Sequence, residues 1–157
     1  MQDLFDVSII DKSLKMNFNF EDSIGYAVNR TAAIMRNSLQ KAFSEVNDEI
    51  TVDYWVILNR LWSMDGWIQS DLARMTHKDN ASMTRMLDGM EKKGIILRRP
   101  DESDRRANLV YLTQKGRDLE VHLKKIARAN MNKAIKNLTV EEINAVKQIL
   151  DKIHDNF

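Results

Sequence analysis

The chain has 157 residues, 43% of them hydrophobic, and a net charge of +1, a composition that fits one domain with a buried core rather than two independent domains. It contains no cysteine, which excludes disulfide scaffolds, thiolate zinc sites and thiol-based redox switches. The first twenty residues have no basic segment followed by a continuous apolar run, and no later run reaches the ~18 apolar residues of a membrane span. We therefore expect a cytoplasmic protein without a membrane partner.

The N-terminal third of the chain predicts helices after an irregular start. Residues 1–18 show no sustained period and are expected to form a loosely held arm. From Ile24 to Val46, apolar residues recur at steps of three and four, which is the period of an amphipathic helix. Thr51 is a candidate N-cap for a second helix, and Asp65 with Gly66 should end it.

The middle of the chain has the pattern of a winged helix-turn-helix. A short helix is expected at 68–75, and after a polar turn a further helix should be capped by Asp79 and ended by Gly94. The second of these helices carries one apolar stripe, formed by Met83, Met86, Leu87 and Met90. Strand-like residues at 95–99 and 108–112, separated by a polar loop, predict a β-hairpin wing.

Two more helices complete a mainly α fold with a small β-hairpin wing. Thr113 should cap a helix that runs towards Leu138, and Thr139 with Glu142 forms the capping box of the last helix. We expect a single domain, with residues 51–112 as the winged lobe and residues 19–48 and 113–157 mainly as dimerisation helices. A two-fold dimer would bury the apolar stripes of these terminal helices, and the alternative is that they pack within one chain.

The positive charge is concentrated in the predicted winged lobe. Residues 54–117 hold 12 basic and 8 acidic side chains, whereas residues 1–53 hold 5 and 9. If the apolar stripe of the lobe's second helix faces the core, polar side chains of the kinds that read base edges in the major groove face outward. These candidates are Asn80, Ser82, Thr84 and Arg85. Singly, each could belong to an ordinary solvated helix face, and it is the helix-turn-helix with its wing that favours DNA.

The segment from Ser70 to Gly116 resembles the MarR (multiple antibiotic resistance regulator) family of bacterial transcription factors. The matching residues are Leu72-Ala73, Thr84-Arg85 with Leu87, Glu91 to Gly94, the wing motif Asp104-Arg105-Arg106, Leu112-Thr113 and Lys115-Gly116. With the flanking helices, the resemblance covers about residues 20–155. It implies a homodimer whose first and last helices intertwine, with two winged lobes on consecutive major grooves of a pseudo-palindromic operator in double-stranded DNA.

The resemblance also implies roles in the wing. The arginine at the position of Arg106 commonly enters the minor groove, the aspartate at the position of Asp104 helps to hold the wing, and Arg105 lies at or near its tip. Without DNA, Asp104 and Arg106 would form only a surface ion pair, worth less than about 1 kcal/mol. Further candidates, for contacts with backbone phosphates, are Lys78, Arg98 and Arg99.

The resemblance further implies a small aromatic or phenolic effector, which in the family binds between the winged lobe and the dimerisation helices. The residues that would border that space are Tyr26, Arg30, Trp55 and Trp62, although aromatic residues at helical spacing more often belong to a core.

Two residues depart from the family pattern. Asn80 and Ala81 stand where many relatives have a basic and a hydroxyl residue, so the operator preference of those relatives cannot be transferred to this chain. Gly89 costs about 1 kcal/mol relative to alanine inside a helix, and the sequence supplies no reason for it.

No catalytic or cofactor chemistry is apparent in the sequence. His77, His122 and His154 lie far apart without a supporting ligand cluster, so we expect no metal site. The glycines form no phosphate loop, and no serine, histidine and acid stand in a nucleophile motif, so we expect neither an enzyme nor a cofactor.

The sequence predicts a dimeric, sequence-specific DNA-binding transcriptional regulator. We expect a repressor, because blocking a promoter needs no further partner. The alternative is a winged-helix protein-interaction module without specific DNA binding.

Overall fold

The computed structural model describes residues 19–101, 104 and 107–157, so the expected arm at 1–18 lies outside the described residues. The chain divides into two compact units, residues 1–37 and residues 38–157. The first unit holds the 3-10 helix η1 (Phe20–Asp22) and most of α2 (Ile24–Ser44), the long helix predicted from the apolar period. Asn19 caps η1 by accepting a hydrogen bond from the backbone N–H of Glu21.

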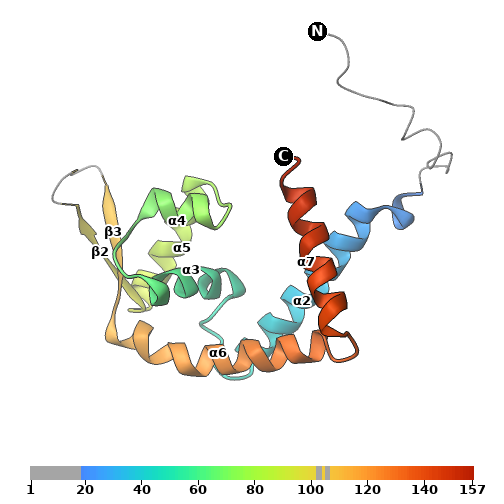
Figure 1. The fold of residues 1–157 in the computed structure, drawn as a ribbon. Helices are drawn as coiled ribbons and strands as arrows, with labels where there is room; N and C mark the ends of the chain where they lie inside the picture. The colour runs from blue at the N-terminus through green and yellow to red at the C-terminus, as the bar shows by residue number, and fades with distance from the viewer. Residues whose placement is uncertain (1–18, 102–103, 105–106) are drawn as a thin grey trace, which may run out of the picture. The chain divides into compact units, whose positions relative to one another are not determined.

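The second unit is a winged helix-turn-helix followed by two helices (Figure 1). Its elements are α3 (Val52–Ser63), β1 (Trp67–Ile68), α4 (Gln69–Met75), α5 (Asn80–Lys92), β2 (Ile96–Pro100), β3 (Asn108–Leu112), α6 (Gln114–Ala134) and α7 (Val140–His154). The three strands form one antiparallel sheet in the order β1-β3-β2. The predicted fold class is therefore confirmed, and the β2–β3 hairpin is called the wing below.

Side-chain caps set the helix boundaries where the sequence placed them. The hydroxyl of Thr51 accepts from the amide of Tyr54 at 3.1 Å and starts α3. The remaining predicted caps, which start α5, α6 and α7, are Asp79, Thr113 and the capping box of Thr139 with Glu142. Gly94 follows the end of α5 with φ +66°, a backbone conformation that glycine adopts without the steric cost of a Cβ.

Several boundaries differ from the prediction. The helix expected from residue 68 begins one residue later, because Trp67 and Ile68 form strand β1 against Val110 and Leu109. Pro100, expected to begin the loop, ends β2 instead. Proline is tolerated here because β2 is an edge strand with a neighbour on one side only, so a residue without a backbone N–H breaks no hydrogen bond to a second strand. Helix α6 ends at Ala134, before residue 138 is reached. In the turn that follows, the Leu138 amide donates a hydrogen bond to the Ile135 carbonyl at 3.0 Å.

Among the described residues, one hydrophobic core joins α3, α4, α5, β2, β3 and α6, with α3 between α5 and α6 (Figure 1). Its buried side chains are Phe43, Ile50, Val52, Ile57, Leu58, Leu61, Leu72, Ala73, Met83, Leu87, Met90, Ile95, Ile96, Val110, Leu112 and Leu123. Each fully buried side chain of leucine size contributes about 1.5–3 kcal/mol. The predicted stripe of α5 is buried except at Met86, which packs at the edge of the core. The stripe therefore fixes which face of α5 remains in solvent.

The described helices include none that is both long and apolar enough to cross a membrane.

Candidate nucleic-acid interface

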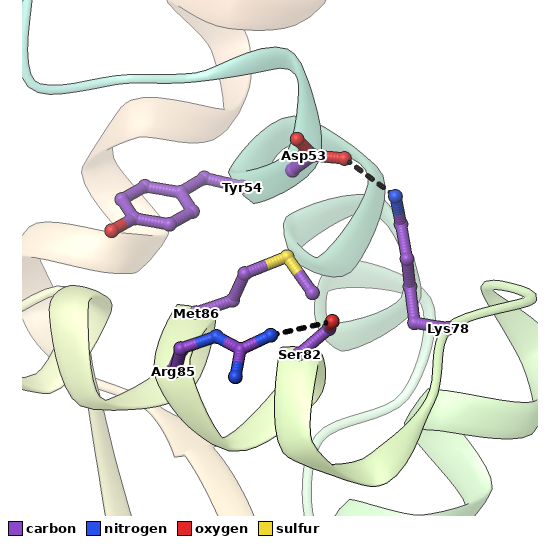
Figure 2. A pocket seen from close by; sticks show the side chains of 6 residues that line it. All are labelled: Asp53, Tyr54, Lys78, Ser82, Arg85 and Met86. Atoms are coloured by element: carbon purple, nitrogen blue, oxygen red, sulfur yellow. Dashed lines mark hydrogen bonds and ion pairs between the residues drawn. The ribbon is translucent and has the colours of Figure 1, made fainter.

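The solvent-facing side of the N-terminal half of α5 carries a chain of polar contacts. The Asp79 carboxylate accepts from both the backbone amide and the hydroxyl of Ser82, each at 2.7 Å. The Arg85 guanidinium in turn donates to the Ser82 hydroxyl at 3.0 Å (Figure 2). The amide hydrogen bond from Ser82 is the main cause that lowers the pKa of Asp79. These contacts hold the exposed Arg85 towards the N-terminus of the helix, whose partial positive charge also favours an anion.

Thr84 links the two helices of the helix-turn-helix. Its hydroxyl donates to the Asn80 carbonyl and accepts from the side-chain amide of Gln69 on α4, both at 2.8 Å. The half-buried hydroxyl thus uses its proton and one lone pair within the protein. Thr84 remains a candidate for base contact, chiefly through its methyl group and remaining lone pair.

The loop that joins β2 and β3 of the wing lies beside the start of α5. The Asp101 amide donates to the Ala107 carbonyl at 3.0 Å, and the Ala107 amide donates to the Asp104 carbonyl at 2.8 Å. Asp104 and Asn80 line one cavity of about 320 Å³, together with Asn108. The structure therefore brings the predicted wing residue Asp104 next to the predicted recognition residue Asn80.

Two predicted wing residues, Arg105 and Arg106, lie outside the described residues. Their minor-groove and phosphate contacts, and the pairing of Asp104 with Arg106, stay predictions.

The three expected phosphate-contact residues have different surroundings. Lys78 pairs with Asp53, with 3.1 Å between Nζ and Oδ1 (Figure 2). Arg98 is held by Asp88 and Glu91 of α5. Arg99 is exposed, and its guanidinium carbon lies 5.8 Å from the centre of the Tyr111 ring.

A cavity of about 330 Å³ opens beside α5 (Figure 2). It is lined by Asp53, Tyr54, Lys78, Ser82, Arg85 and Met86. Burial raises the pKa of the Tyr54 phenol, so this hydroxyl is a neutral donor and acceptor at physiological pH. The hydroxyl oxygen of Tyr54 lies so close to Gly89 that a Cβ added at Gly89 would overlap it. This contact accounts for the glycine that the sequence left unexplained.

The expected effector residues fall in the two units. In the first unit, the Arg30 guanidinium carbon lies 5.7 Å from the centre of the Tyr26 ring. In the second unit, the rings of Trp55 and Trp62 pack edge to face with 5.6 Å between centroids, and both pack against the core. The Trp62 indole also donates to the Gly116 carbonyl at 3.0 Å. A structural role accounts for both tryptophans, and their contact with an effector stays a prediction.

Two of the three histidines, which are distant in sequence, lie close together in the second unit. The rings of His77 and His154 have centroids 5.9 Å apart. His77 occupies the turn between α4 and α5 with φ +52°, a left-handed conformation that is uncommon for residues other than glycine. In the described part of the chain, no group of three or more histidine, aspartate or glutamate side chains is arranged to hold a metal ion.

The ion pairs of Arg98 predict a pH dependence of stability. The hydrogen bond from Arg98 is the main cause that lowers the pKa of Glu91 below its ordinary value of 4.5. A carboxylate with a lowered folded-state pKa stabilises the fold above its unfolded pKa, and this stability is lost as pH falls through the folded value. We therefore expect the melting temperature of Glu91→Gln to fall less than that of the wild type between about pH 5 and pH 3. Thermal melts with the exposed Glu45→Gln as control would test this, and parallel curves would contradict it.

Part of the chain is similar in sequence to known winged helix-turn-helix proteins. A family model described as the MarR family matches residues 50–107. The uncharacterized HTH-type transcriptional regulator YdgJ of Bacillus subtilis (strain 168) is 33% identical over 100 residues, which cover 64% of this chain. The chain spans only 61% of the length of that relative.

Two solved structures share the fold. A mutant MarR from E. coli, complexed with operator DNA, has a TM-score of 0.80 and 24% identity over 88% of this chain and 99% of that one. BpsR of Bordetella bronchiseptica, studied for the regulation of its DNA binding by 6-hydroxynicotinic acid, has a TM-score of 0.81 and 21% identity over 89% and 99%. The chain is thus similar to the MarR family over residues 50–107, and it shares the winged helix-turn-helix fold of these two solved structures.

Proposed function

We propose that the protein is a sequence-specific, double-stranded DNA-binding transcriptional regulator rather than an enzyme, and that it acts in the cytoplasm. The observation that carries this proposal is the exposed face of α5, on which Asn80 lies beside Asp104 of the wing loop and Arg85 is held by Ser82. A helix fits the major groove, where asparagine pairs with adenine and arginine with guanine. The name of YdgJ and the operator complex of the E. coli relative support the same class of function.

Each part of this surface has a distinct role in the proposal. The base edges are read by Asn80, Ser82, Thr84 and Arg85. Arg106 enters the minor groove and Asp104 holds the wing, while Arg105, Lys78 and Arg99 contact phosphates. The phosphate contacts supply affinity and register, and the base contacts supply sequence preference.

Removal of the recognition arginines should weaken operator binding. We expect Arg85→Ala and Arg106→Ala each to lower the affinity for the operator by about 1–3 kcal/mol, which corresponds to a factor of about 5 to 150. Fluorescence anisotropy or a gel shift with the promoter region beside the protein's own gene measures this. Arg128→Ala, which removes an exposed arginine from α6, serves as the control.

Two results would count against the proposal. Specific binding that survives both recognition substitutions would contradict the assigned surface. An absence of specific binding, with weak binding that depends little on salt, would favour the protein-interaction module, because DNA binding releases counterions and weakens steeply as salt rises.

The apolar face of α7 supports a homodimer. Helix α7 has no buried residue within the chain. Val146, Ile149 and Leu150 recur at helical spacing and are 52%, 52% and 42% exposed. A soluble protein normally buries such a stripe, and a two-fold interface with a second copy would do so.

Introduction of charge into this face should separate the subunits. We expect Ile149→Glu to shift the protein towards a monomer and to reduce operator binding, because one lobe alone reaches only half of a pseudo-palindrome. Light scattering after size-exclusion chromatography gives the mass. Gln148→Glu places the same charge on an exposed neighbouring position and should leave the dimer intact. Equal masses for both variants and the wild type would contradict this interface.

We further propose that the protein is a repressor and that a small aromatic or phenolic acid releases it from DNA. Occupation of a promoter is sufficient for repression, and the relative BpsR is regulated by 6-hydroxynicotinic acid. A thermal-shift screen of aromatic acids, followed by anisotropy with the operator, tests the effector. A compound that stabilises the protein without weakening DNA binding would not be the proposed effector.

A further inference from the structure

Arg98 lies in the wing strand β2 but makes its polar contacts with the recognition helix. Its Nε and Nη2 atoms donate to Glu91 Oε2 at 3.1 and 2.6 Å, and Nη2 also donates to Asp88 Oδ1 at 2.6 Å. The backbone amide of Arg98 donates to the other Glu91 oxygen at 3.0 Å. Both the main chain and the side chain of one strand residue are thus fixed to α5.

These contacts are stronger than an ordinary surface ion pair. The Arg98 side chain is only 21% exposed, and its planar guanidinium engages two carboxylates at once. The hydrogen bond to Glu91 raises the pKa of Arg98, and the reciprocal contact lowers the pKa of Glu91. One positive charge meets two negative charges, so this cluster has a net negative charge and offers no net attraction to a phosphate.

The neighbouring Arg99 has the opposite character. Side chains alternate between the two faces of a strand, and Arg99 is exposed, with its guanidinium near the Tyr111 ring. Among the described residues it forms no ion pair. Arg98 and Arg99 are therefore neighbours in the same strand, but only Arg98 pairs with the carboxylates of α5.

We propose that Arg98 is a positioning residue for operator recognition, which holds the wing at a fixed angle to α5 through Asp88 and Glu91 and does not contact phosphate. The proposal rests on the proposed function, since it concerns how two DNA-reading elements are held together. It replaces the phosphate contact that the sequence suggested for Arg98.

The effect on recognition follows from geometry. Asp88 lies one helical turn after Arg85, on the half of α5 that the wing strand contacts. Specific binding requires the helix and the wing to meet their grooves at the same time, so preorganisation of their angle favours it. Non-specific binding depends on phosphate contacts that tolerate many arrangements, and should depend little on this angle.

Salt-dependent binding separates positioning from phosphate contact. For Arg98→Gln we expect operator affinity to fall about tenfold while affinity for an unrelated duplex changes less than about twofold. The slope of log affinity against log salt should stay unchanged. Glu91→Gln should weaken operator binding in the same direction, and Arg98→Lys should not restore it, because an ammonium lacks the planar fork.

The control is Arg99→Gln, which removes the adjacent charge without disturbing the cluster and is expected to lower the salt slope by about 0.9 if Arg99 contacts one phosphate. Three results would overturn the positioning role. These are a lowered slope with Arg98→Gln, tighter binding by Glu91→Gln as Arg98 is freed for phosphate, or unchanged operator affinity in both variants.

A measurement without DNA distinguishes failure of this proposal from failure of the proposed function. Because the chain has no cysteine, spin labels attach only at introduced positions such as Ala81→Cys on α5 and Asn108→Cys on the wing, both exposed. In label-diluted samples, we expect Arg98→Gln to broaden the distance distribution between the labels and Arg99→Gln to leave it unchanged. Identical distributions in Arg98→Gln and the wild type would reject the positioning role, even if the protein binds its operator.

Discussion

Gly116→Ala is expected to lower the free energy of unfolding by about 1–3 kcal/mol, the usual cost of forcing an extra methyl group into a packed site. A Cβ at Gly116 would overlap the carbonyl oxygen of Ile95 and lie 3.0 Å from Leu112 Cδ2. The Ile95 oxygen cannot withdraw easily, because it accepts hydrogen bonds from the backbone amide and the hydroxyl of Thr113 at 3.1 and 3.0 Å. The first turn of α6 would have to move, and the Gly116 carbonyl that accepts from the Trp62 indole would move with it.

Chemical denaturation of Gly116→Ala beside Gly25→Ala would measure this effect. A Cβ at Gly25, in the first turn of α2, meets no atom within 4 Å. We expect Gly25→Ala to leave stability unchanged or to raise it by up to about 1 kcal/mol, through the higher helix propensity of alanine. Equal midpoints for Gly116→Ala and the wild type would mean that the start of α6 can shift without cost, which would contradict the packing argument.

The elements that the sequence predicted well are those whose ends depend on local chemistry. Thr51, Asp79 and Thr113 each bond a backbone amide three residues ahead, so the signal and the structure lie in the same short segment. Gly94 ends α5 for an equally local reason, its positive φ. The apolar stripe of α5 likewise predicted its buried face, and thereby which of its side chains remain exposed.

The features that the sequence could not predict depend on contacts between distant segments. Strand β1 has only two residues, too few for an alternating pattern, and exists because β3 lies beside it. The basic pair at Arg98 and Arg99 looked uniform, yet only one of the two meets Asp88 and Glu91. Trp55 and Trp62 could equally have lined a ligand space or a core, and periodicity does not separate these cases.

Gly89 is a further feature of this kind, and its effect can be tested by a double-mutant cycle with Tyr54. Alanine is favoured over glycine within a helix by about 1 kcal/mol, so a free position would gain stability. At Gly89 the added Cβ would overlap the Tyr54 hydroxyl, on a ring that is half-buried against the core. We therefore expect Gly89→Ala to destabilise the wild type by about 1–2 kcal/mol, as overpacking does.

Removal of the hydroxyl should reverse the sign. In Tyr54→Phe the nearest ring atom would lie 3.3 Å from the new Cβ, which a small shift of the ring accommodates. Gly89→Ala should then stabilise that background by up to about 1 kcal/mol, giving a coupling of about 1–3 kcal/mol between the two positions. The same sign in both backgrounds would show that Tyr54 does not set the requirement for glycine. Because α5 also carries Asn80 and Arg85, operator affinity should follow the same pattern, lowered in Gly89→Ala and recovered in the double variant.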